Sequence, residues 1–282
     1  MKGRPLKIRR LNEKNEDSTK FFEEQRRATG ESGEKYQLQQ NDQGFKDASS
    51  ALPEFLVPGR EMQQPSRFPS YALLSGPPKC GKTSLLLQLA CNLAVDAQAR
   101  VVFICKRQNF ENDYIYLSRD LETASEVSER VHIKYVKSGD ELRKYFAAFH
   151  LQRELPTAVI VDDFVEFFTD SYERQRFQLQ TTGEVSLVKA LSLCRSAIEY
   201  ANAKAMSGMQ CRLIISDTHP RDGPRLLYIF KRWMPLMYVI KGLRDSSRFS
   251  LELQDIRTGG VSNVIGKFTL AHQALHFDGL EA

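Results

Sequence analysis

The chain has 282 residues, of which 41% are hydrophobic and 27% are charged, and this composition predicts at least one globular core. No run reaches the ~18 consecutive apolar residues that cross a bilayer, and the basic start from Met1 to Arg10 has no apolar segment after it. We therefore expect neither a membrane span nor a secretory signal. The five widely spaced cysteines form no Cys-x-x-Cys pair, which argues against a disulfide framework or a thiolate zinc site. The net charge of +5 permits polyanion binding without requiring it.

The first 66 residues differ in composition from the rest. Residues 1–66 are rich in Gln, Glu, Lys, Ser, Asn and Asp, with apolar residues only in short pieces such as Phe21-Phe22. Such a segment buries too little surface to offset chain entropy, so we predict a disordered charged arm followed by one domain over residues 67–282. The basic stretch from Lys2 to Arg10 is typical of a nuclear-localisation signal or a nucleic-acid-binding arm, and equally of a solvated tail. On this basis we expect a nuclear protein.

Beyond residue 67, short apolar runs alternate with helical patterns, which is typical of α/β proteins. The spacing predicts core strands over residues 71–75, 101–105, 158–161 and 213–215, and a further strand over residues 132–136. It predicts helices over residues 82–95, 120–129, 140–151 and 184–204. The end of the chain predicts strands with tight connections over residues 236–241, 249–254, 267–271 and 274–277. The predicted fold class is α/β: a P-loop core with a mostly parallel sheet flanked by helices, and an antiparallel C-terminal extension.

A phosphate-binding motif lies between the first predicted core strand and the helix that follows. Residues Gly76, Pro77, Pro78, Lys79, Cys80, Gly81, Lys82 and Thr83 match G-x-x-x-x-G-K-[ST]. We expect these eight residues, and Ser84 after them, to bind ATP. Glycines let backbone N–H groups turn toward phosphate oxygens at the positive end of a helix. We expect Lys82 to contact the β- and γ-phosphates of ATP and the Thr83 hydroxyl to bind Mg²⁺. An accidental glycine-rich turn is the alternative.

A nucleotide site of this class also needs a carboxylate at the end of a neighbouring strand. The apolar run at residues 158–161 is followed directly by Asp162 and Asp163. We expect Asp162 to bind Mg²⁺, directly or through water, with Asp163 as second candidate. Helix capping or a solvated loop is the alternative for both acids.

The order of these motifs resembles the RecA-like recombinase family, in particular the eukaryotic strand-exchange recombinases and their small paralogues. The resemblance covers roughly residues 67 to 282, and its C-terminal part rests on the basic strand at residues 236–242, the segment 248–256 and the final Asp278-Gly279. It implies ATP and Mg²⁺ binding and an accessory role in homologous recombination. Within the paralogues, the narrower resemblance is to an ATPase that associates with a SWIM-type zinc-finger protein. A protein partner of that kind, or a recombinase, and a hetero-oligomer are implied.

Two departures from the family pattern bear on catalysis. Active recombinases place a water-orienting glutamate just past the second strand, where this chain has Arg107. A guanidinium cannot accept a proton from water, so no catalytic residue is assigned. The Asn-Gln pair of recombinases is replaced by Ser216-Asp217-Thr218. We expect retained ATP binding with weak or absent hydrolysis, or a weak DNA-stimulated ATPase; Glu111 or Asp163 would substitute for the glutamate if the register slips.

Two segments correspond to the DNA-facing loops of the family. The first covers residues 169–180 and the second residues 219–233, and both carry cations interleaved with aromatic rings, a composition that suits single-stranded DNA. The candidate DNA contacts are Arg174, Arg176, Arg221 and Arg225. The alternative is a solvated loop for the first segment and, for the second, an amphipathic helix that places Trp233 in the core.

Two other function classes remain open from the sequence. A small-molecule kinase would use the same phosphate loop, with the cluster from Arg221 to Arg232 as a lid. A nucleotide-binding scaffold without DNA-related activity would keep Lys82 and Thr83 and lose turnover. Salt-dependent binding to single-stranded DNA separates the recombination hypothesis from both.

Overall fold

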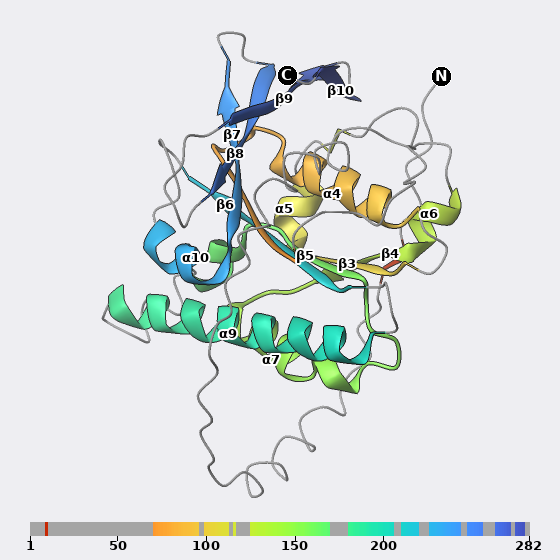
Figure 1. Cartoon of the computed structure of the whole chain (residues 1–282), viewed down its shortest axis with the longest axis vertical. Helices are drawn as coiled ribbons and strands as arrows, with labels where there is room; N and C mark the ends of the chain where they lie inside the picture. The colour runs from red at the N-terminus through yellow and green to blue at the C-terminus, as the bar shows by residue number, and fades with distance from the viewer. Residues whose placement is uncertain are drawn as a thin grey trace, which may run out of the picture.

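The computed structural model describes residues 9–10, 70–95, 99–112, 115–116, 125–169, 180–205, 210–219, 226–243, 247–255, 263–271 and 274–279. Within these ranges one sheet runs through the molecule in the order β1-β4-β3-β5-β6-β2-β7-β8-β9-β10 (Figure 1). Its strands are β1 (Arg9–Arg10), β2 (Tyr71–Gly76), β3 (Val101–Cys105), β4 (Val131–Tyr135), β5 (Ala158–Val161), β6 (Arg212–Thr218), β7 (Leu236–Gly242), β8 (Arg248–Asp255), β9 (Asn263–Ala271) and β10 (Ala274–Gly279).

The strands from β4 to β7 pair in parallel, and β2 lies between β6 and β7. Strands β3 and β5 are buried along their whole length. Continuous apolar runs rich in Val and Ile suit such strands because a parallel sheet covered on both faces leaves no solvent side. All the parallel strands therefore end at one edge of the sheet, and the loops that follow β2, β3, β5 and β6 meet there.

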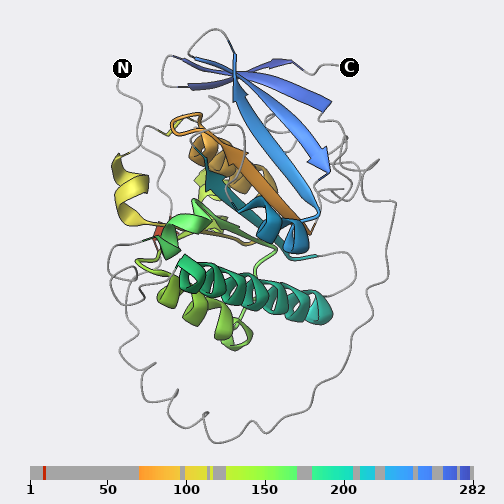
Figure 2. The same cartoon turned by 90° about the vertical axis from the view of Figure 1, so that its left-hand side faces the viewer.

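Helices cover both faces of the parallel core (Figure 2). On one face α4 (Lys82–Leu93) packs over the sheet, with α5 (Arg107–Asn112) and α6 (Ser125–Arg130) contributing Phe110 and Val127 to the same cluster. On the other face lie α7 (Gly139–Ala147), α9 (Gln180–Lys204) and α10 (Leu227–Trp233). The short helices η2 (Phe149–Leu151) and η3 (Phe164–Phe168) complete that layer.

The C-terminal strands add an antiparallel extension to the parallel core. Strand β7 pairs in parallel with β2 and antiparallel with β8, and β8, β9 and β10 continue as antiparallel neighbours. The predicted fold class is confirmed: an α/β fold with a mostly parallel sheet flanked by helices and an antiparallel extension at the C-terminal end.

Two elements extend beyond the predicted pattern. The sequence predicted no helix directly after β3 and none directly after β5, yet α5 and η3 form there. Both are only one or two turns long, too short for helical periodicity to stand out. The predicted helix over 184–204 begins earlier, at Gln180, and five of the six residues of its apolar stripe are buried: Leu187, Leu191, Cys194, Ile198 and Ala201. Val188 of the same stripe is exposed.

The predicted N-terminal arm lies outside the described residues except for Arg9 and Arg10. These two residues form β1, which pairs in parallel with the edge strand β4; Arg9 is opposite His132 and Arg10 is opposite Ile133. Among the described residues, no helix is long and apolar enough to cross a bilayer.

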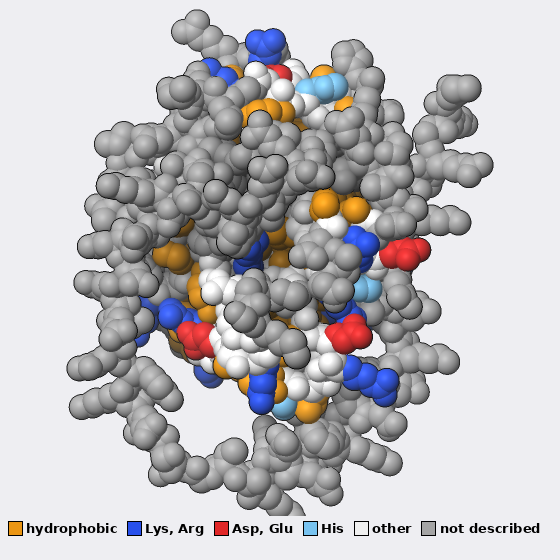
Figure 3. Space-filling model, turned by 45° about the vertical axis from the view of Figure 1, so that its right-hand side comes forward, with side chains coloured by type: hydrophobic (Ala, Val, Ile, Leu, Met, Phe, Trp, Pro, Cys, Tyr) orange, Lys and Arg blue, Asp and Glu red, His pale blue; other side chains and the backbone are white. Residues whose placement is uncertain are grey.

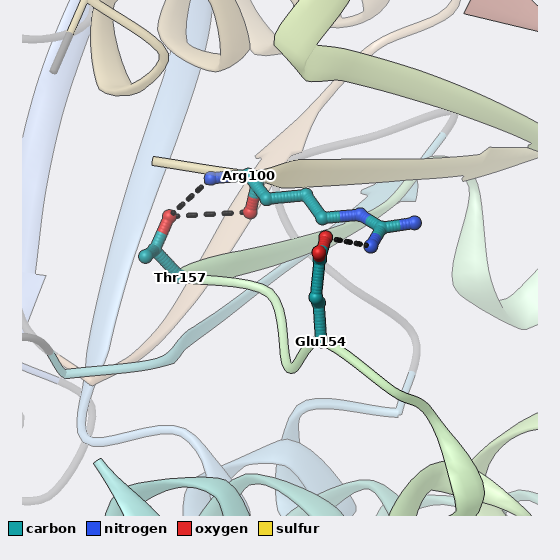
Figure 4. A network of polar contacts seen from close by, with 3 residues as sticks. All are labelled: Arg100, Glu154 and Thr157. Carbon is teal, nitrogen blue, oxygen red and sulfur yellow. Dashed lines mark hydrogen bonds and ion pairs between the residues drawn. The ribbon is translucent and has the colours of Figure 1, made fainter. Parts of the chain in front are cut away.

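A polar network joins the amino ends of β3 and β5, at the edge opposite the phosphate loop (Figure 4). The Thr157 hydroxyl accepts a hydrogen bond from the Arg100 backbone N–H and donates one to the Arg100 carbonyl, both at 3.2 Å. The Arg100 guanidinium donates to Glu154 at 2.9 Å. This network joins the two strand starts and so helps to hold in register the two strands whose far ends form the candidate site.

Candidate nucleotide site

The predicted phosphate loop is a tight turn between β2 and α4. Two of its residues adopt the left-handed region: Lys79 with φ 60° and Gly81 with φ 83°. At Gly81 a side chain would be strained by this φ. At Gly76 space is the limit, because a Cβ there would lie 2.7 Å from Cys80 Sγ and 3.0 Å from Ile240 Cβ. Both glycines of the motif are thus needed for the shape of the loop, which brings backbone N–H groups to the positive end of α4.

Lys82 begins α4 and its side chain folds back over the loop. The residue is buried, and Nζ donates to the Pro77 carbonyl oxygen at 3.1 Å and to that of Gly76 at 3.5 Å. These neutral acceptors hold the ammonium above the loop, where phosphate oxygens would offer stronger, charge-assisted hydrogen bonds.

Thr83 and Asp162 meet across the carboxyl edge of the sheet, although 79 positions separate them in the sequence. The Thr83 hydroxyl donates to Asp162 Oδ2 at 2.7 Å. The other carboxylate oxygen, Oδ1, accepts from the Ser216 hydroxyl at 2.6 Å, so both oxygens are engaged. Asp162 stands directly after β5, Ser216 lies near the end of β6, and Thr83 is in the first turn of α4. The structure therefore brings together the two residues predicted to bind magnesium.

The buried position of Asp162 changes its acidity. Desolvation raises its pKa to about 6, and the charge of Asp163 acts in the same direction, while the hydrogen bonds from Ser216 and Thr83 and the charge of Lys82 lower the pKa. A carboxylate with these opposing influences ionises near neutral pH. A cation between Asp162 and the phosphates would favour the ionised form further.

The donors at this edge fit magnesium chemically. A carboxylate and a hydroxyl are hard oxygen ligands, which Mg²⁺ prefers, and Mg²⁺ in nucleotide sites is held by one or two protein groups, with phosphate oxygens and water. Within the described ranges no three His, Cys, Asp or Glu side chains gather as a metal site of their own.

Asp163, the second acid, points to a different neighbour. Its backbone has φ 48°, in the left-handed region, which is uncommon for a residue with a side chain. Its N–H donates to the Ser216 hydroxyl at 2.8 Å, and its Oδ1 accepts from the hydroxyl of Thr218. Strand pairing places Thr218 opposite Gly76, the first residue of the phosphate loop. Asp163 thus lies beside the loop, linked to the end of β6.

Ser216 and Thr218 were not predicted as site residues, since the sequence showed them only as departures from the recombinase pattern. The signal that identified Asp162 also applies to them: both are polar and lie at the end of an apolar core strand. Ser84, the last residue predicted to bind ATP, is buried, and its hydroxyl accepts from the Tyr116 N–H at 2.9 Å.

Two cations of the segment after β3, Lys106 and Arg107, contact neighbouring side chains and backbone of the protein. Lys106 Nζ donates to the Glu166 carbonyl oxygen at 3.0 Å and lies 5.7 Å from the Phe167 ring centre. The Arg107 guanidinium lies 4.7 Å from the centre of the Tyr135 ring and 3.9 Å from Glu111. Glu111, one of the two substitutes considered for the recombinase glutamate, is therefore an ion-pair partner of Arg107.

Two cysteines line the site, Cys80 in the loop and Cys105 at the end of β3. Burial raises the pKa of the Cys80 thiol, although Lys82 acts in the opposite direction. Burial also raises the pKa of Cys105, and the charge of Asp162 adds to this effect. Both are protonated at neutral pH, and a thiol is a weak nucleophile in that state.

The four predicted DNA contacts, Arg174, Arg176, Arg221 and Arg225, lie outside the described residues. Trp233 ends α10 and packs, partly buried, against the core cluster on the α9 face, as the helix interpretation predicted. On the face seen in Figure 3, described Lys and Arg side chains are interspersed with Asp and Glu.

No protein-family model matches the chain, and no curated protein matches it. Among solved structures, the chain is similar to one titled "Crystal structure of the RadB recombinase", with a TM-score of 0.48 and 14% identity. The match covers 73% of this chain and 90% of that chain. At this similarity we infer neither activity nor partner from the recombinase.

Proposed function

We propose that the chain binds ATP with Mg²⁺ and acts as a RecA-like accessory factor in homologous recombination. The observation that carries the nucleotide part is the hydrogen bond of 2.7 Å between Thr83 and Asp162 beside the folded-back Lys82. Asp162, 79 positions further along the chain, thus meets the loop whose sequence matches the phosphate-binding motif. The resemblance of residues 67–282 to recombinase paralogues supports the cellular role.

Each of these residues has a defined part in binding. The N–H groups at the start of α4 would bind phosphate oxygens, and Lys82 would leave the carbonyls of Gly76 and Pro77 for the β- and γ-phosphates. Thr83 would turn its hydroxyl oxygen from Asp162 toward the cation, and Ser216 would hold the Asp162 carboxylate in place. When bound, Mg²⁺ would neutralise phosphate charge.

We propose that hydrolysis is weak or absent without a partner or DNA. The side chains after β3 support this, because Arg107 faces Tyr135 and Glu111 and cannot accept a proton from water. ATP would then act mostly as a conformational ligand, shifting DNA or partner affinity only as far as it binds two states of the chain differently.

The remaining parts of the proposal rest on the sequence. Single-stranded DNA is the proposed nucleic acid, with Arg174, Arg176, Arg221 and Arg225 as contacts. A SWIM-type zinc-finger protein or a recombinase is the proposed partner, in a hetero-oligomer, and the nucleus is the proposed location. Residues 1–66 would be the charged arm and residues 67–282 the ATP-binding domain.

The first experiment measures ATP binding and turnover by the purified chain at fixed salt, with and without single-stranded DNA, beside Lys82→Ala. Binding with little turnover, lost in Lys82→Ala, is the expected result. Rapid turnover without DNA would contradict the assignment of Arg107. Phosphate transfer to a small acceptor would instead favour a kinase.

A salt titration of DNA binding separates the recombination hypothesis from a scaffold. For single strands each phosphate contact contributes about 0.7 to the slope of log K against log salt concentration. The double variant Arg221→Ala, Arg225→Ala should therefore lower that slope by about 1.4. A wild-type chain that binds no single-stranded DNA at low salt would contradict the DNA part of the proposal and leave ATP binding standing.

A further inference from the structure

The C-terminal hairpin of β9 and β10 places the side chain of Leu270 against the phosphate loop. A Cβ built on Gly81 would lie 2.7 Å from Leu270 Cδ1, 3.3 Å from Cδ2 and 3.4 Å from Cγ. The isobutyl group of Leu270 thus occupies the space that a side chain at position 81 would take. Leu270 is partly buried and packs against the core cluster on the α4 face, which contains Leu85 and Leu86 of α4.

Gly81 is the residue whose position matters most for this contact. It directly precedes α4, and its φ of 83° sets the direction in which the helix leaves the loop. Lys82 and Thr83 follow it immediately, so a shift of Gly81 displaces both the ammonium and the hydroxyl of the candidate site. Because protein interiors are close-packed, a side chain seated against this glycine limits such shifts.

The position of Leu270 is itself well determined. Its N–H donates to the Ser247 carbonyl oxygen at 2.9 Å. The residue before it, Thr269, is paired with Arg248 of β8 and donates its hydroxyl to Asp278 of β10. Leu270 is opposite Leu275 in the hairpin. Strands on both sides therefore hold the side chain that packs on the loop.

We propose that Leu270 is a positioning residue of the nucleotide site, and that the β9–β10 hairpin and the phosphate loop respond to nucleotide together. This inference rests on the proposed nucleotide binding and adds a region that the phosphate-binding motif does not contain. Because linkage is reciprocal, a nucleotide that stabilises the loop stabilises the hairpin, and loosening the hairpin weakens nucleotide binding.

The binding test compares Leu270→Ala with a matched deletion in the same extension. Leu253 of β8 is buried in the core cluster against which Leu270 packs. It is paired with Tyr238, which is paired with Leu74 in the middle of β2, so Leu253 is further than Leu270 from the edge where the phosphate loop lies. Calorimetry on the full chain should give about tenfold weaker binding of Mg-ADP for Leu270→Ala. Leu253→Ala, and Leu270→Met, which keeps the volume, should remain within about twofold of the wild type.

Hydrogen exchange on the wild-type chain provides a readout that needs no variant to fold. Saturating Mg-ADP should slow exchange of amides in residues 263–271 and 274–279 as well as at the start of α4. An equal loss of affinity in Leu270→Ala and Leu253→Ala would overturn the inference, as would nucleotide binding without protection of the hairpin. If the wild-type chain binds no nucleotide, the proposed function itself fails, and the inference fails with it.

Discussion

Two segments leave the same edge of the parallel sheet and differ in what their side chains do. The phosphate loop after β2 directs Lys82 and Thr83 toward the space above the loop and toward Asp162. The segment after β3 directs Lys106 toward Glu166 and Phe167, and Arg107 toward Tyr135 and Glu111. Nucleotide binding and water activation are separate tasks at this edge. The described groups after β2 suit the first task, whereas Glu111, an acid in the segment after β3, is paired with Arg107.

The largest effect is expected from Lys82→Ala. Loss of charge-assisted hydrogen bonds to phosphate, each worth about 1.5–3 kcal/mol, should weaken ATP binding about 100-fold or more. Lys79→Ala is the matched control, since it removes an exposed lysine from the same loop and should change affinity less than about threefold. Equal losses in both variants would show that the loop attracts nucleotide only through its total charge.

Asp162→Asn tests the magnesium part of the site and its pH dependence. Because burial raises the pKa of Asp162 to about 6, the wild type should bind Mg-ATP more weakly at pH 5 than at pH 7.5, as the carboxyl protonates. The variant should bind Mg-ATP no better than ATP without magnesium at either pH. Calorimetry with and without Mg²⁺ measures both differences, and an unchanged magnesium dependence would exclude Asp162 as ligand.

Rising pH should strengthen Mg-ATP binding through the Asp162 carboxyl, but it should lower the free energy of unfolding through the same group. The folded-state pKa of Asp162 lies above its ordinary value of 3.8, so the native chain keeps a proton that the unfolded chain has released. Wild-type stability should therefore fall by about 3 kcal/mol as pH rises from about 4 to above 6, relative to Asp162→Asn. Urea unfolding of both chains without nucleotide tests this, and parallel pH profiles would contradict the buried ionisation.

A smaller loss is expected from Thr83→Val, which keeps the shape of the side chain and removes the hydroxyl. Affinity for Mg-ATP should fall about tenfold through the lost cation ligand and the unsatisfied Asp162 oxygen. Thr83→Ser keeps the hydroxyl and should recover most of the affinity. A valine variant that binds as tightly as the wild type would remove Thr83 from the magnesium site.

The smallest effect is expected from Arg107→Ala. The side chain is more than half exposed, and its contacts are a ring and an ion pair of 3.9 Å, so stability should change by less than about 1 kcal/mol. ATP affinity and turnover should stay within about twofold. A tenfold fall in turnover would show that Arg107 acts on the nucleotide. The segment after β3 would then take part in the site, as the phosphate loop does.

The sequence by itself determined the parts of the protein that are local. Apolar runs identified β2, β3, β5 and β6, and the glycine spacing between β2 and α4 identified the phosphate loop. Both were visible because a buried strand requires consecutive apolar residues and a left-handed turn favours glycine. The rule that a carboxylate follows a core strand identified Asp162 as well. The same rule applied to β6 would have drawn attention to Ser216 and Thr218.

Only the tertiary structure decided which distant side chains meet. The order of the strands brings the end of β5 next to that of β6, and so the Ser216 hydroxyl to Asp162. The folding of the antiparallel extension back over the α4 face places Leu270 against Gly81. Neither contact leaves a periodic trace in the sequence, because a contact between distant residues depends on strand order and packing rather than on the spacing of neighbours.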